Sequence, residues 1–449
     1  MEQRIPRVML AGVSSGCGKT TLTCAVLQAL VNRGYRVGAF KCGPDYIDPM
    51  FHSRIIGAKS RNLDLHFFRE NTLRYLLCKN AADRDVSVIE GVMGYYDGIG
   101  ITSHTSSCEV AQVTDSPVVL VVNAKGASLS VLAAIQGFLA FSPNNHIRGV
   151  ILNQCSAMTY GALAEEIEKR LGIRAYGYLP RMADCTLESR HLGLVTAAEV
   201  AHLREKLQAL AQQAEATIDL DGLLALANGA PRTSCDPIAL SRQENVRIAV
   251  ARDKAFCFYY EDNLEAMKQM GAELVEFSPL HDEALPEDIH GLYLGGGYPE
   301  LYAQQLSQNQ SMRESVCAAL EHGLPCIAEC GGFMYLTQDI GGHPMVGYLS
   351  GSCFDTGKLT RFGYVTLRAK EDNLLCKAGD EIPGHEFHHW DCTHPGSSFT
   401  AVKPTGKHWD CAVATDRLYA GFPHFHFYAN SNFLQNFYCA CVKEKHRYD

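Results

Sequence analysis

The stretch Gly12–Thr21, GVSSGCGKTT, follows a short apolar run and precedes a helix-forming segment. Glycines let backbone N–H groups curl around phosphate oxygens, Lys19 supplies a positive charge, and the Thr20 hydroxyl can bind Mg²⁺. Five residues separate its first glycine from the glycine before the lysine, one more than in the common GxxxxGK[ST] motif. The stretch therefore predicts a variant phosphate-binding loop. We expect the nucleotide to be bound by Gly12, Ser15, Gly16, Gly18, Lys19, Thr20 and Thr21.

Around this loop, short apolar runs alternate with helical segments. Runs that are apolar nearly throughout are typical of strands buried on both faces, as in a parallel sheet covered by helices. The alternation predicts a doubly wound α/β domain with a mainly parallel sheet. We expect strands at Val8–Ala11, Val37–Phe40, Val86–Ile89, Val118–Val122, Val150–Leu152 and Ala175–Leu179, and helices that include Thr20–Arg33 and Ala162–Leu171.

A second alternation begins near Val246 and predicts a second α/β domain. The polar segment between the two halves contains two prolines, which is typical of a linker. We expect a first domain at 1–228, a linker at 229–245 and a second domain at 246–449. The strands expected in the second domain are Arg247–Ala251, Leu274–Phe277, Gly291–Leu294, Cys326–Ala328 and Ala412–Ala414.

Three carboxylates follow predicted strands of the first domain: Asp45, Asp48 and Glu90. In open α/β sheets, ligands lie beyond the carboxyl ends of the strands, and Mg²⁺ prefers oxygen ligands. We therefore expect the three carboxylates to face the phosphates and to arrange metal and substrate, with Mg²⁺ bound by Thr20, Asp45 and Glu90. Any one of them alone would be interpreted as a solvated loop residue.

The second domain contains a cysteine at the end of a predicted strand, with glycines after it, in the sequence Glu329–Phe333, ECGGF. This arrangement is typical of a nucleophile elbow, in which a sharp turn exposes the sulfur of Cys330 at a helix N-terminus. A thiolate needs a base, for which His424 and His426 are candidates, and an oxyanion loop, for which Gly295–Gly297 is the candidate. The pattern predicts acyl-transfer chemistry. The alternative for Cys330 is a buried structural cysteine, which we expect for most of the other seventeen.

Composition restricts the class of protein. The chain has 449 residues, 47% of them hydrophobic and 20% charged, as in ordinary globular proteins of two or three domains. Its net charge of −9 argues against nucleic-acid binding, and no apolar run reaches about 18 residues, so no membrane span is expected. Its 18 cysteines include no CxxC pair, and the N-terminus is no secretory signal, so we expect reduced thiols in the cytoplasm.

The chain resembles the cobyrinate a,c-diamide synthase family over essentially its whole length. Its first domain is similar to the dethiobiotin-synthetase-like branch of P-loop proteins, and its second domain resembles class I (triad) glutamine amidotransferases. The motifs that carry the resemblance are KCGPDYIDP at 41–49, NLD at 62–64, EGVMGYYDG at 90–98, SRHLGL at 189–194, LGGGYPELYA at 294–303, ECGGFMYL at 329–336 and GHEFHH at 384–389.

The resemblance implies an ATP- and Mg²⁺-dependent carbon–nitrogen ligase. A carboxylate of cobyrinate, or of a related tetrapyrrole, would be activated as an acyl phosphate. Ammonia from glutamine hydrolysis at Cys330 would then form the amide, first on one and then on the other of the a and c side chains. By the same resemblance, His424 is the base. His426 stands where many amidotransferases have an orienting carboxylate, so the third member of the triad stays open. Glu329, directly before the nucleophile, could have a structural role.

Alternatives remain at this point. A related enzyme installs the same two amides on nickel sirohydrochlorin, in the nickel tetrapyrrole pathway of methanogens; the cobalt corrinoid of cobalamin biosynthesis is favoured. The P-loop branch also contains ParA-like ATPase switches, so a second interpretation is such a switch with a degenerate amidotransferase domain. A third interpretation is a substrate-binding protein. A homodimer is possible. Residues that could contact a polycarboxylate macrocycle are Arg54, Arg61, Arg190, Tyr46, Phe51, Tyr95 and Tyr96.

Overall fold

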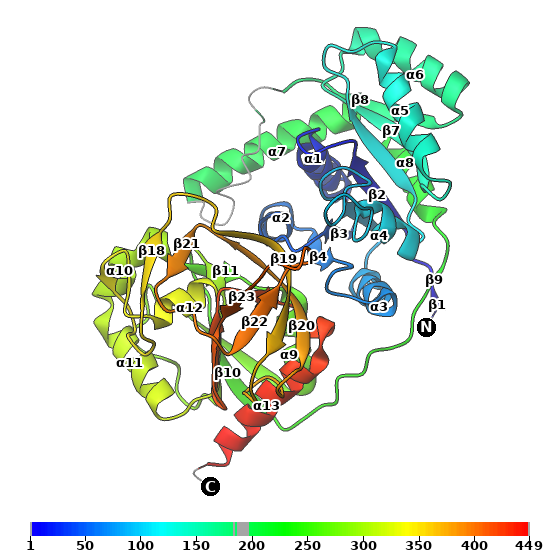
Figure 1. The fold of residues 1–449 in the computed structure, drawn as a ribbon. Coiled ribbons are helices and arrows are strands. Elements are labelled where there is room, and N and C mark those ends of the chain that lie inside the picture. Colours follow the sequence, from blue (N-terminus) through cyan, green and yellow to red (C-terminus); the bar gives the residue numbers. More distant parts are fainter. Residues whose placement is uncertain (1, 183–184, 186–196, 448–449) are drawn as a thin grey trace. The chain divides into compact units, whose positions relative to one another are not determined.

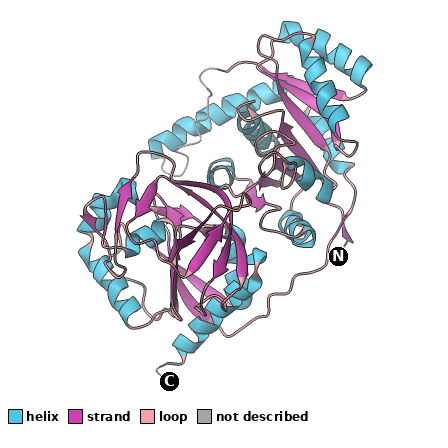
Figure 2. Ribbon diagram, viewed as in Figure 1, coloured by secondary structure: helices cyan, strands magenta, loops and turns pink. Residues whose placement is uncertain are grey.

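The computed structural model describes residues 2–182, 185 and 197–447 (Figure 1). The chain forms two compact units, 1–238 and 239–449, and each combines helices with strands (Figure 2). The boundary between the units falls inside the segment 229–245 predicted to be a linker. Arg190 and the SRHLGL motif lie outside the described residues. None of the described helices combines the length and apolar character that crossing a membrane requires.

The first unit is built on a sheet whose seven strands in the described residues run in the order β4-β3-β5-β2-β6-β7-β8 and pair in parallel throughout. This confirms the predicted doubly wound α/β fold with its parallel sheet. The strands are β2 (Arg7–Gly12), β3 (Val37–Cys42), β4 (Lys59–Leu63), β5 (Val86–Glu90), β6 (Val118–Asn123), β7 (Ile147–Asn153) and β8 (Arg174–Leu179), with β1 (Glu2–Gln3) and β9 (Thr233–Ser234) paired separately.

The helices of this unit are α1 (Lys19–Asn32), α2 (Ile47–Phe51), the π-helical turn η1 (His52–Ile56), α3 (Glu70–Ala81), α4 (Ser107–Val113), α5 (Ser130–Phe141), α6 (Ala157–Leu171), α7 (Ala197–Thr217) and α8 (Leu220–Asn228).

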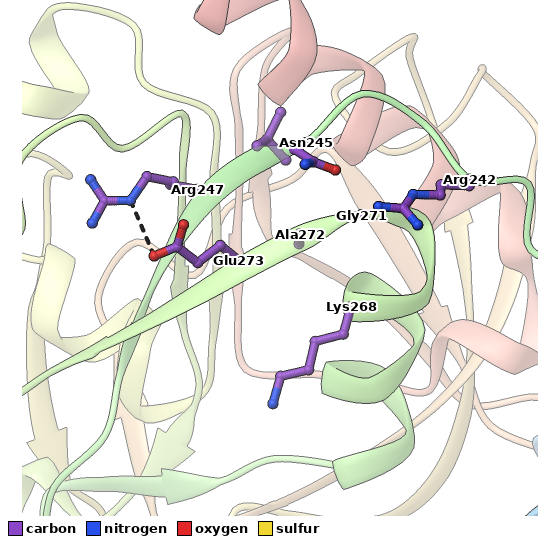
Figure 3. A pocket seen from close by; sticks show the side chains of 8 residues that line it. Arg242, Asn245, Arg247, Lys268, Gly271, Ala272 and Glu273 are labelled. Carbon is purple, nitrogen blue, oxygen red and sulfur yellow. Dashed lines mark ion pairs between the residues drawn. The ribbon is translucent and has the colours of Figure 1, made fainter.

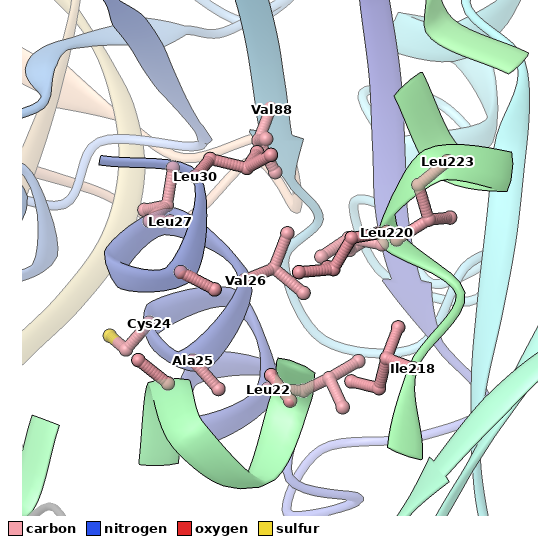
Figure 4. Close-up of a cluster of buried hydrophobic side chains, with 14 of the residues drawn as sticks. Leu22, Cys24, Ala25, Val26, Leu27, Leu30, Val88, Ile218, Leu220 and Leu223 are labelled. Carbon is pink, nitrogen blue, oxygen red and sulfur yellow. The ribbon is translucent and has the colours of Figure 1, made fainter. Parts of the chain in front are cut away.

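Helix α1 is apolar around most of its circumference and is buried accordingly. Figure 4 shows its side chains packed against residues from other elements, including Val88 of β5 and Leu220 and Leu223 of α8. Leu22 and Leu27 of this helix are fully buried. Because a fully buried leucine contributes roughly 1.5–3 kcal/mol by leaving water, this packing fixes the helix on which the phosphate loop ends.

Strand register places the candidate residues at one edge of the sheet. Leu10 of β2 pairs with Glu90 of β5, and Lys41 of β3 pairs with the same Glu90. Since all three strands are parallel, their carboxyl ends meet at the same edge. The phosphate loop after β2, the segment after β3 and Glu90 therefore lie together.

The second unit contains a six-stranded sheet in the order β12-β10-β13-β15-β25-β24 and a five-stranded antiparallel sheet in the order β23-β22-β19-β20-β26, both counted in the described residues. Its α/β character confirms the predicted class. The antiparallel sheet and strand β25 (Leu418–Gly421) are not part of the sequence prediction. Ala412–Ala414 was expected as a sheet strand; the structure has β24 (Val413–Ala414), antiparallel at the edge, while β25 is the parallel neighbour of β15.

The remaining elements of this unit in the described residues are strands β10 (Val246–Ala251), β11 (Phe256–Phe258), β12 (Ala272–Phe277), β13 (Gly291–Leu294), β14 (Gly296–Gly297), β15 (Cys326–Glu329), β16 (Asp339–Ile340), β17 (His343–Pro344), β18 (Ser352–Asp355), β19 (Arg361–Ala369), β20 (Glu381–His388), β21 (Trp390–Cys392), β22 (Phe399–Val402), β23 (His408–Cys411) and β26 (His424–Phe425), and helices α9 (Glu261–Met270), η4 (Pro299–Tyr302), α10 (Ala303–Gln308), α11 (Gln310–Glu321), α12 (Gly331–Leu336), η5 (Phe427–Ala429) and α13 (Ser431–Lys445).

Candidate active site

The phosphate loop joins β2 to α1 and depends on two glycines that tolerate no side chain. A Cβ atom on Gly12 would lie 2.3 Å from the sulfur of Cys17, and one on Gly18 would lie 2.0 Å from Nδ2 of Asn153. Gly18 also has a φ of 91°, a left-handed conformation that favours glycine. Asn153, the last residue of β7, donates from Nδ2 to the carbonyl oxygen of Cys17 at 2.8 Å, so a strand two positions from β2 in the sheet fixes the loop.

The remaining predicted loop residues occupy distinct positions. Lys19 Nζ donates to the carbonyl oxygens of Ser14, at 3.0 Å, and Met93, and burial lowers the pKa of Lys19. Thr20 Oγ1 donates to Oε1 of Glu90 at 2.7 Å. Lys19 and Thr20 are thus already turned toward the carboxyl edge of the sheet. Three further predicted residues are less buried: Ser15 and Gly16, which are exposed at the tip of the loop, and Thr21, which is partly buried in α1.

A buried lysine joins two of the predicted carboxylates. Lys41 Nζ lies 2.8 Å from Glu90 Oε1 and 2.6 Å from Asp48 Oδ2. Burial disfavours the charge on Lys41, but Glu90, Asp48 and Asp45 together raise its pKa well above the ordinary value. Lys41 therefore stays charged at the end of β3. In the sequence, Lys41 was noted only as part of the motif KCGPDYIDP. Its position near the end of a buried strand, close to the phosphate loop, could have indicated its role.

Asp45 and Asp48 occupy a turn that the structure fixes firmly. Asp45 Oδ1 accepts the N–H of Ile47 at 2.8 Å, and Asn62 donates to the carbonyl oxygens of Gly43 and Asp45 at 2.9 and 2.7 Å. Burial, and then the charge of Asp48, raises the pKa of Asp45 to about 7. Burial also acts to raise the pKa of Asp48, but Lys41 outweighs it and the result lies below the ordinary value. One carboxyl of the pair is therefore readily protonated while the other is ionised.

The oxygen atoms near the phosphate loop fit a magnesium ion that binds together with a nucleotide. The hydroxyl of Thr20 and a carboxylate oxygen of fully buried Glu90 are adjacent, and both are hard ligands of the kind that Mg²⁺ prefers. Among the described residues, no three His, Cys, Asp or Glu side chains are arranged to hold a metal ion by themselves. The donor set is thus that of a shared site, to which phosphate oxygens contribute.

In the second unit, Cys330 occupies the turn between β15 and α12. Its φ of 48° and ψ of −101° are unfavourable for a residue with a side chain. The turn is held because the N–H of Cys330 donates to the carbonyl oxygen of Gly421 at 2.7 Å. Burial raises the pKa of the Cys330 thiol, and the charge of Glu300 raises it further. The thiol is therefore neutral in this structure and needs a base to react.

A buried carboxylate orients the candidate base. Oε2 of Glu329 lies 2.9 Å from Nδ1 of His424, and Oε1 of Glu329 accepts a hydrogen bond from the Tyr293 hydroxyl at 3.0 Å. Because a carboxylate accepts, Nδ1 of His424 carries the proton, and Nε2 is the nitrogen that can act as a base. His385 stacks on the ring of His424 with 5.1 Å between centroids.

His426, the other histidine predicted from the sequence, has a different environment. Its Nδ1 accepts the N–H of Tyr428 at 3.2 Å, at the start of η5. The group bonded to Nδ1 of His424 is Glu329, for which sequence analysis considered only a structural role. This carboxylate was hard to identify because it lies directly before the nucleophile, on another strand than the histidine.

The glycine loop lies against both His424 and the nucleophile elbow. A Cβ atom on Gly296 would lie 2.6 Å from Cε1 of His424, and one on Gly331 would lie 3.1 Å from the backbone nitrogen of Gly297. Gly295, by contrast, donates its N–H to the Tyr259 hydroxyl at 2.8 Å. Gly296 therefore lies beside the candidate base and Gly297 beside the elbow, while the N–H of Gly295 serves the fold.

A pocket of about 290 Å³ in the second unit lies apart from this chemistry (Figure 3). It is lined by Val246 and Ala272, which begin the parallel strands β10 and β12. Cys330, however, follows the carboxyl end of β15 in the same sheet. The pocket thus opens at the amino edge, opposite to the edge at which α/β sheets bind ligands.

The residues suggested as contacts of a macrocycle mostly pack inside the first unit. Tyr95 is fully buried, and Tyr46 and Phe51 are also buried. Tyr96 donates to the carbonyl oxygen of Phe138 at 2.7 Å. Two basic residues differ in exposure: Arg61 is buried and Arg54 is exposed.

Comparison with known proteins gives both units a class. Residues 8–195 match the model of the CobQ/CobB/MinD/ParA nucleotide-binding domain, and residues 247–432 match that of the CobB/CobQ-like glutamine amidotransferase domain. The fold and the two sites thus define a nucleotide-binding P-loop protein with an attached glutamine amidotransferase domain.

Relatives named cobyrinate a,c-diamide synthase match nearly the whole chain. The relative from Caldanaerobacter subterraneus subsp. tengcongensis is 42% identical over 96% of this chain and 98% of its own length. Those from Priestia megaterium and Thermoplasma volcanium are 39% identical, over 98% of both chains in each case. The chain belongs to the cobyrinate a,c-diamide synthase family. Membership confirms the resemblance noted in the sequence and the predicted class of enzyme, a ligase with a nucleotide-binding domain and a glutamine amidotransferase domain.

We expect Gly18→Ala to weaken ATP binding at least about tenfold, because the added methyl group displaces Asn153 from the loop; this equals a loss of roughly 1.4 kcal/mol. Isothermal titration calorimetry measures the affinity. Gly34→Ala is the matched control, since Gly34 has a similar φ of 85° but open space around its Cβ position. Equal affinities of the two variants would contradict the role given to the contact with Asn153.

The raised pKa of Asp45 predicts a stability that depends on pH. The folded carboxyl titrates at about 7 and the unfolded one near its ordinary value. The folded state therefore keeps a proton that the unfolded state has lost, and stability falls as pH rises from about 4 to 7. The loss is at most about 4 kcal/mol at 1.36 kcal/mol per pH unit. Urea unfolding without nucleotide from pH 5 to 8 should show a fall for the wild type that Asp45→Asn largely removes. Parallel curves would show that Asp45 titrates normally.

Proposed function

We propose that this chain amidates the a and c acetate side chains of cobyrinate, a cobalt corrinoid, with ATP and glutamine as co-substrates in cobalamin biosynthesis. The observation that carries the proposal is the agreement of relatives with this name over nearly the full length of the chain. It is further supported by the two separate sites described above, one suited to phosphate and one to a thiol nucleophile.

In the first unit, the task is to make a carboxylate reactive. Lys19 and the backbone N–H groups of the phosphate loop bind the phosphates of ATP, and a substrate carboxylate oxygen attacks the γ-phosphorus to give an acyl phosphate and ADP. Mg²⁺, held by Thr20, Asp45 and Glu90 together with phosphate oxygens, would supply positive charge for this transfer. Lys41 pairs with Glu90 and Asp48 beside the phosphates.

In the second unit, the task is to release ammonia from glutamine. His424 takes the proton of the Cys330 thiol, and the sulfur attacks the side-chain amide carbon. The N–H groups of the Gly296–Gly297 loop and of Gly331 stabilise the oxyanion that forms. Ammonia leaves with the proton that His424 returns, and water then hydrolyses the thioester to glutamate. Glu329 stabilises the imidazolium that exists between the two proton transfers.

Incubation with ATP, Mg²⁺, glutamine and one macrocycle at a time tests the whole proposal. Mass spectrometry should detect two amides on cobyrinate and, at matched concentration, none or far fewer on nickel sirohydrochlorin. A preference for the nickel compound would assign the chain to that alternative substrate. ATP hydrolysis without amidation of either compound would instead favour an ATPase switch.

Two variants separate the two half-reactions. Cys330→Ala should abolish amidation with glutamine and retain it with ammonium chloride, because only the release of ammonia needs the thiol. Lys19→Ala should lose amidation with either nitrogen source, because the acyl phosphate is not formed. Amide formation is followed by mass spectrometry. Unchanged glutamine-dependent activity in Cys330→Ala would refute the role of this residue.

The partner of His424 is tested by a pair of substitutions. Glu329→Gln should lower kcat for glutamine hydrolysis roughly 10²- to 10⁴-fold, as loss of the orienting carboxylate does in catalytic triads. His426→Asn should change it little, since an asparagine oxygen can still accept the N–H of Tyr428. Ammonia-dependent amidation is the control for both variants. The reverse order of effects would make His426 the orienting group.

A further inference from the structure

Glu386 is a buried carboxylate of the second unit that the chemistry described so far does not use. It lies on β20, directly after His385, and is 2% exposed. Its Oε2 atom has no hydrogen-bond partner among the described residues. A buried polar atom without a partner is costly, so its presence in a native structure requires an explanation.

The imidazole of His388 faces the same carboxylate in a fixed orientation. Its Nδ1 lies 2.6 Å from the carbonyl oxygen of Trp390 and therefore carries a hydrogen, because a carbonyl oxygen only accepts. Its ring stacks on Phe422 with 4.1 Å between centroids and 8° between planes. Its Nε2 also has no hydrogen-bond partner in the described part of the chain and lies 3.8 Å from Oε2 of Glu386, beyond hydrogen-bond distance.

In a neutral ring, the two facing atoms are both acceptors. A lone pair on Nε2 and a carboxylate oxygen repel each other unless a donor lies between them. A group that carries both a positive charge and several N–H donors satisfies both atoms at once, and an ammonium group has these properties.

The pair of Glu386 and His388 is close to the nucleophile. Phe422, on which His388 stacks, directly follows Gly421, whose carbonyl oxygen accepts the N–H of Cys330. Phe422 also contacts Phe333 of α12, the helix that begins after the nucleophile, with 5.1 Å between ring centroids. The charge of Glu386 also contributes, after burial and Glu300, to raising the pKa of the Cys330 thiol. The carboxylate is thus close enough to act on the reacting sulfur.

We propose that Glu386, together with Nε2 of His388, binds the α-ammonium group of glutamine. This inference rests on the proposed function, since it concerns the substrate of the thiol site. The ammonium group donates to both acceptors, and the side-chain amide extends toward Cys330. Its positive charge pairs with the carboxylate of Glu386, so the contact contributes mainly to binding of the correct amino acid.

Glu300 is the other carboxylate whose charge raises the pKa of the Cys330 thiol. It is a weaker candidate than Glu386 for binding the ammonium group. Burial raises the pKa of Glu300 to about 7. At neutral pH this carboxyl is therefore about half protonated, which makes it a poor partner for a cation. In the part of the chain that the structure describes, a histidine faces Glu386 at ion-pair distance and none faces Glu300.

Kinetics with glutamine and with glutaramate, the same molecule without the α-amino group, test this proposal. Wild type should prefer glutamine in kcat/KM by about 10- to 150-fold, the range for a hydrogen bond to a charged group. Glu386→Gln should lose most of that preference, mainly through a higher KM for glutamine, with kcat/KM for glutaramate within about twofold of wild type. Glu381→Gln, an exposed glutamate on the same strand, is the matched control and should behave as wild type.

Other outcomes overturn the inference or the proposed function separately. Equal losses with both substrates in Glu386→Gln, or collapse of the preference in Glu300→Gln alone, would show that Glu386 does not read the ammonium group. Wild type that hydrolyses neither compound would instead refute the proposed thiol chemistry. If Glu386→Gln does not fold by circular dichroism, calorimetry with full-length Cys330→Ala decides. Glutamine should then bind at least about tenfold more tightly than glutaramate, and equal affinities would overturn the inference.

Discussion

The fully buried carboxylate of Glu90 is the interaction on which the first site depends. It accepts the hydroxyl of Thr20 from the helix after the phosphate loop and the ammonium group of Lys41 from the neighbouring strand. A buried carboxylate without such partners would be protonated or would destabilise the fold by several kcal/mol. The same contacts that satisfy its charge therefore hold helix α1, strand β3 and strand β5 at fixed distances. The geometry of the phosphate site follows from the need to pair one charge.

The second unit repeats this arrangement with different chemistry. Glu329 is the last residue of its strand, as Glu90 is, and it is likewise buried; both of its oxygens contact groups from other strands. Here the partner is a histidine instead of a lysine, so the carboxylate selects a tautomer rather than balancing a permanent charge. In both units the last residue of a central strand is a glutamate, and that glutamate contacts a side chain of the candidate site. The carboxyl edge of a parallel sheet makes this possible, because adjacent strands end side by side there.

Local features of the sequence predict much of this structure. The phosphate loop, the elbow at Cys330 and most parallel strands are specified within ten residues or fewer, by glycine placement and by continuous apolar runs. Strand β25 is missed because Leu418–Gly421 is short, contains alanine and glycine, and has no β-branched residue. The strands of the five-stranded antiparallel sheet are missed because the prediction for the second domain rests on a repeat of the α/β alternation, and these strands have no helices between them.

Partners between distant parts of the chain could not be predicted in the same way. The contact between Glu329 and His424 spans 95 residues, and it forms because the segment after β25 runs beside the end of β15. The resemblance to amidotransferases indicated only a position two residues after the histidine, where this chain has His426, and so left the third triad member open. Lys41 was quoted but given no role for the same reason: its importance depends on Glu90, two strands later in the chain but adjacent in the sheet.

Charge balance distinguishes the two sites. In the first unit, the ammonium group of Lys41 already pairs with both Glu90 and Asp48 in the protein alone. Around Cys330, by contrast, Glu300 and Glu386 have no lysine or arginine ion-pair partner among the described residues, and both oppose ionisation of the sulfur. In the proposed arrangement, the positive charge near the sulfur arrives with the substrate. The two sites therefore differ in where the balancing charge comes from: from the fold in the first unit, and from the bound molecule in the second.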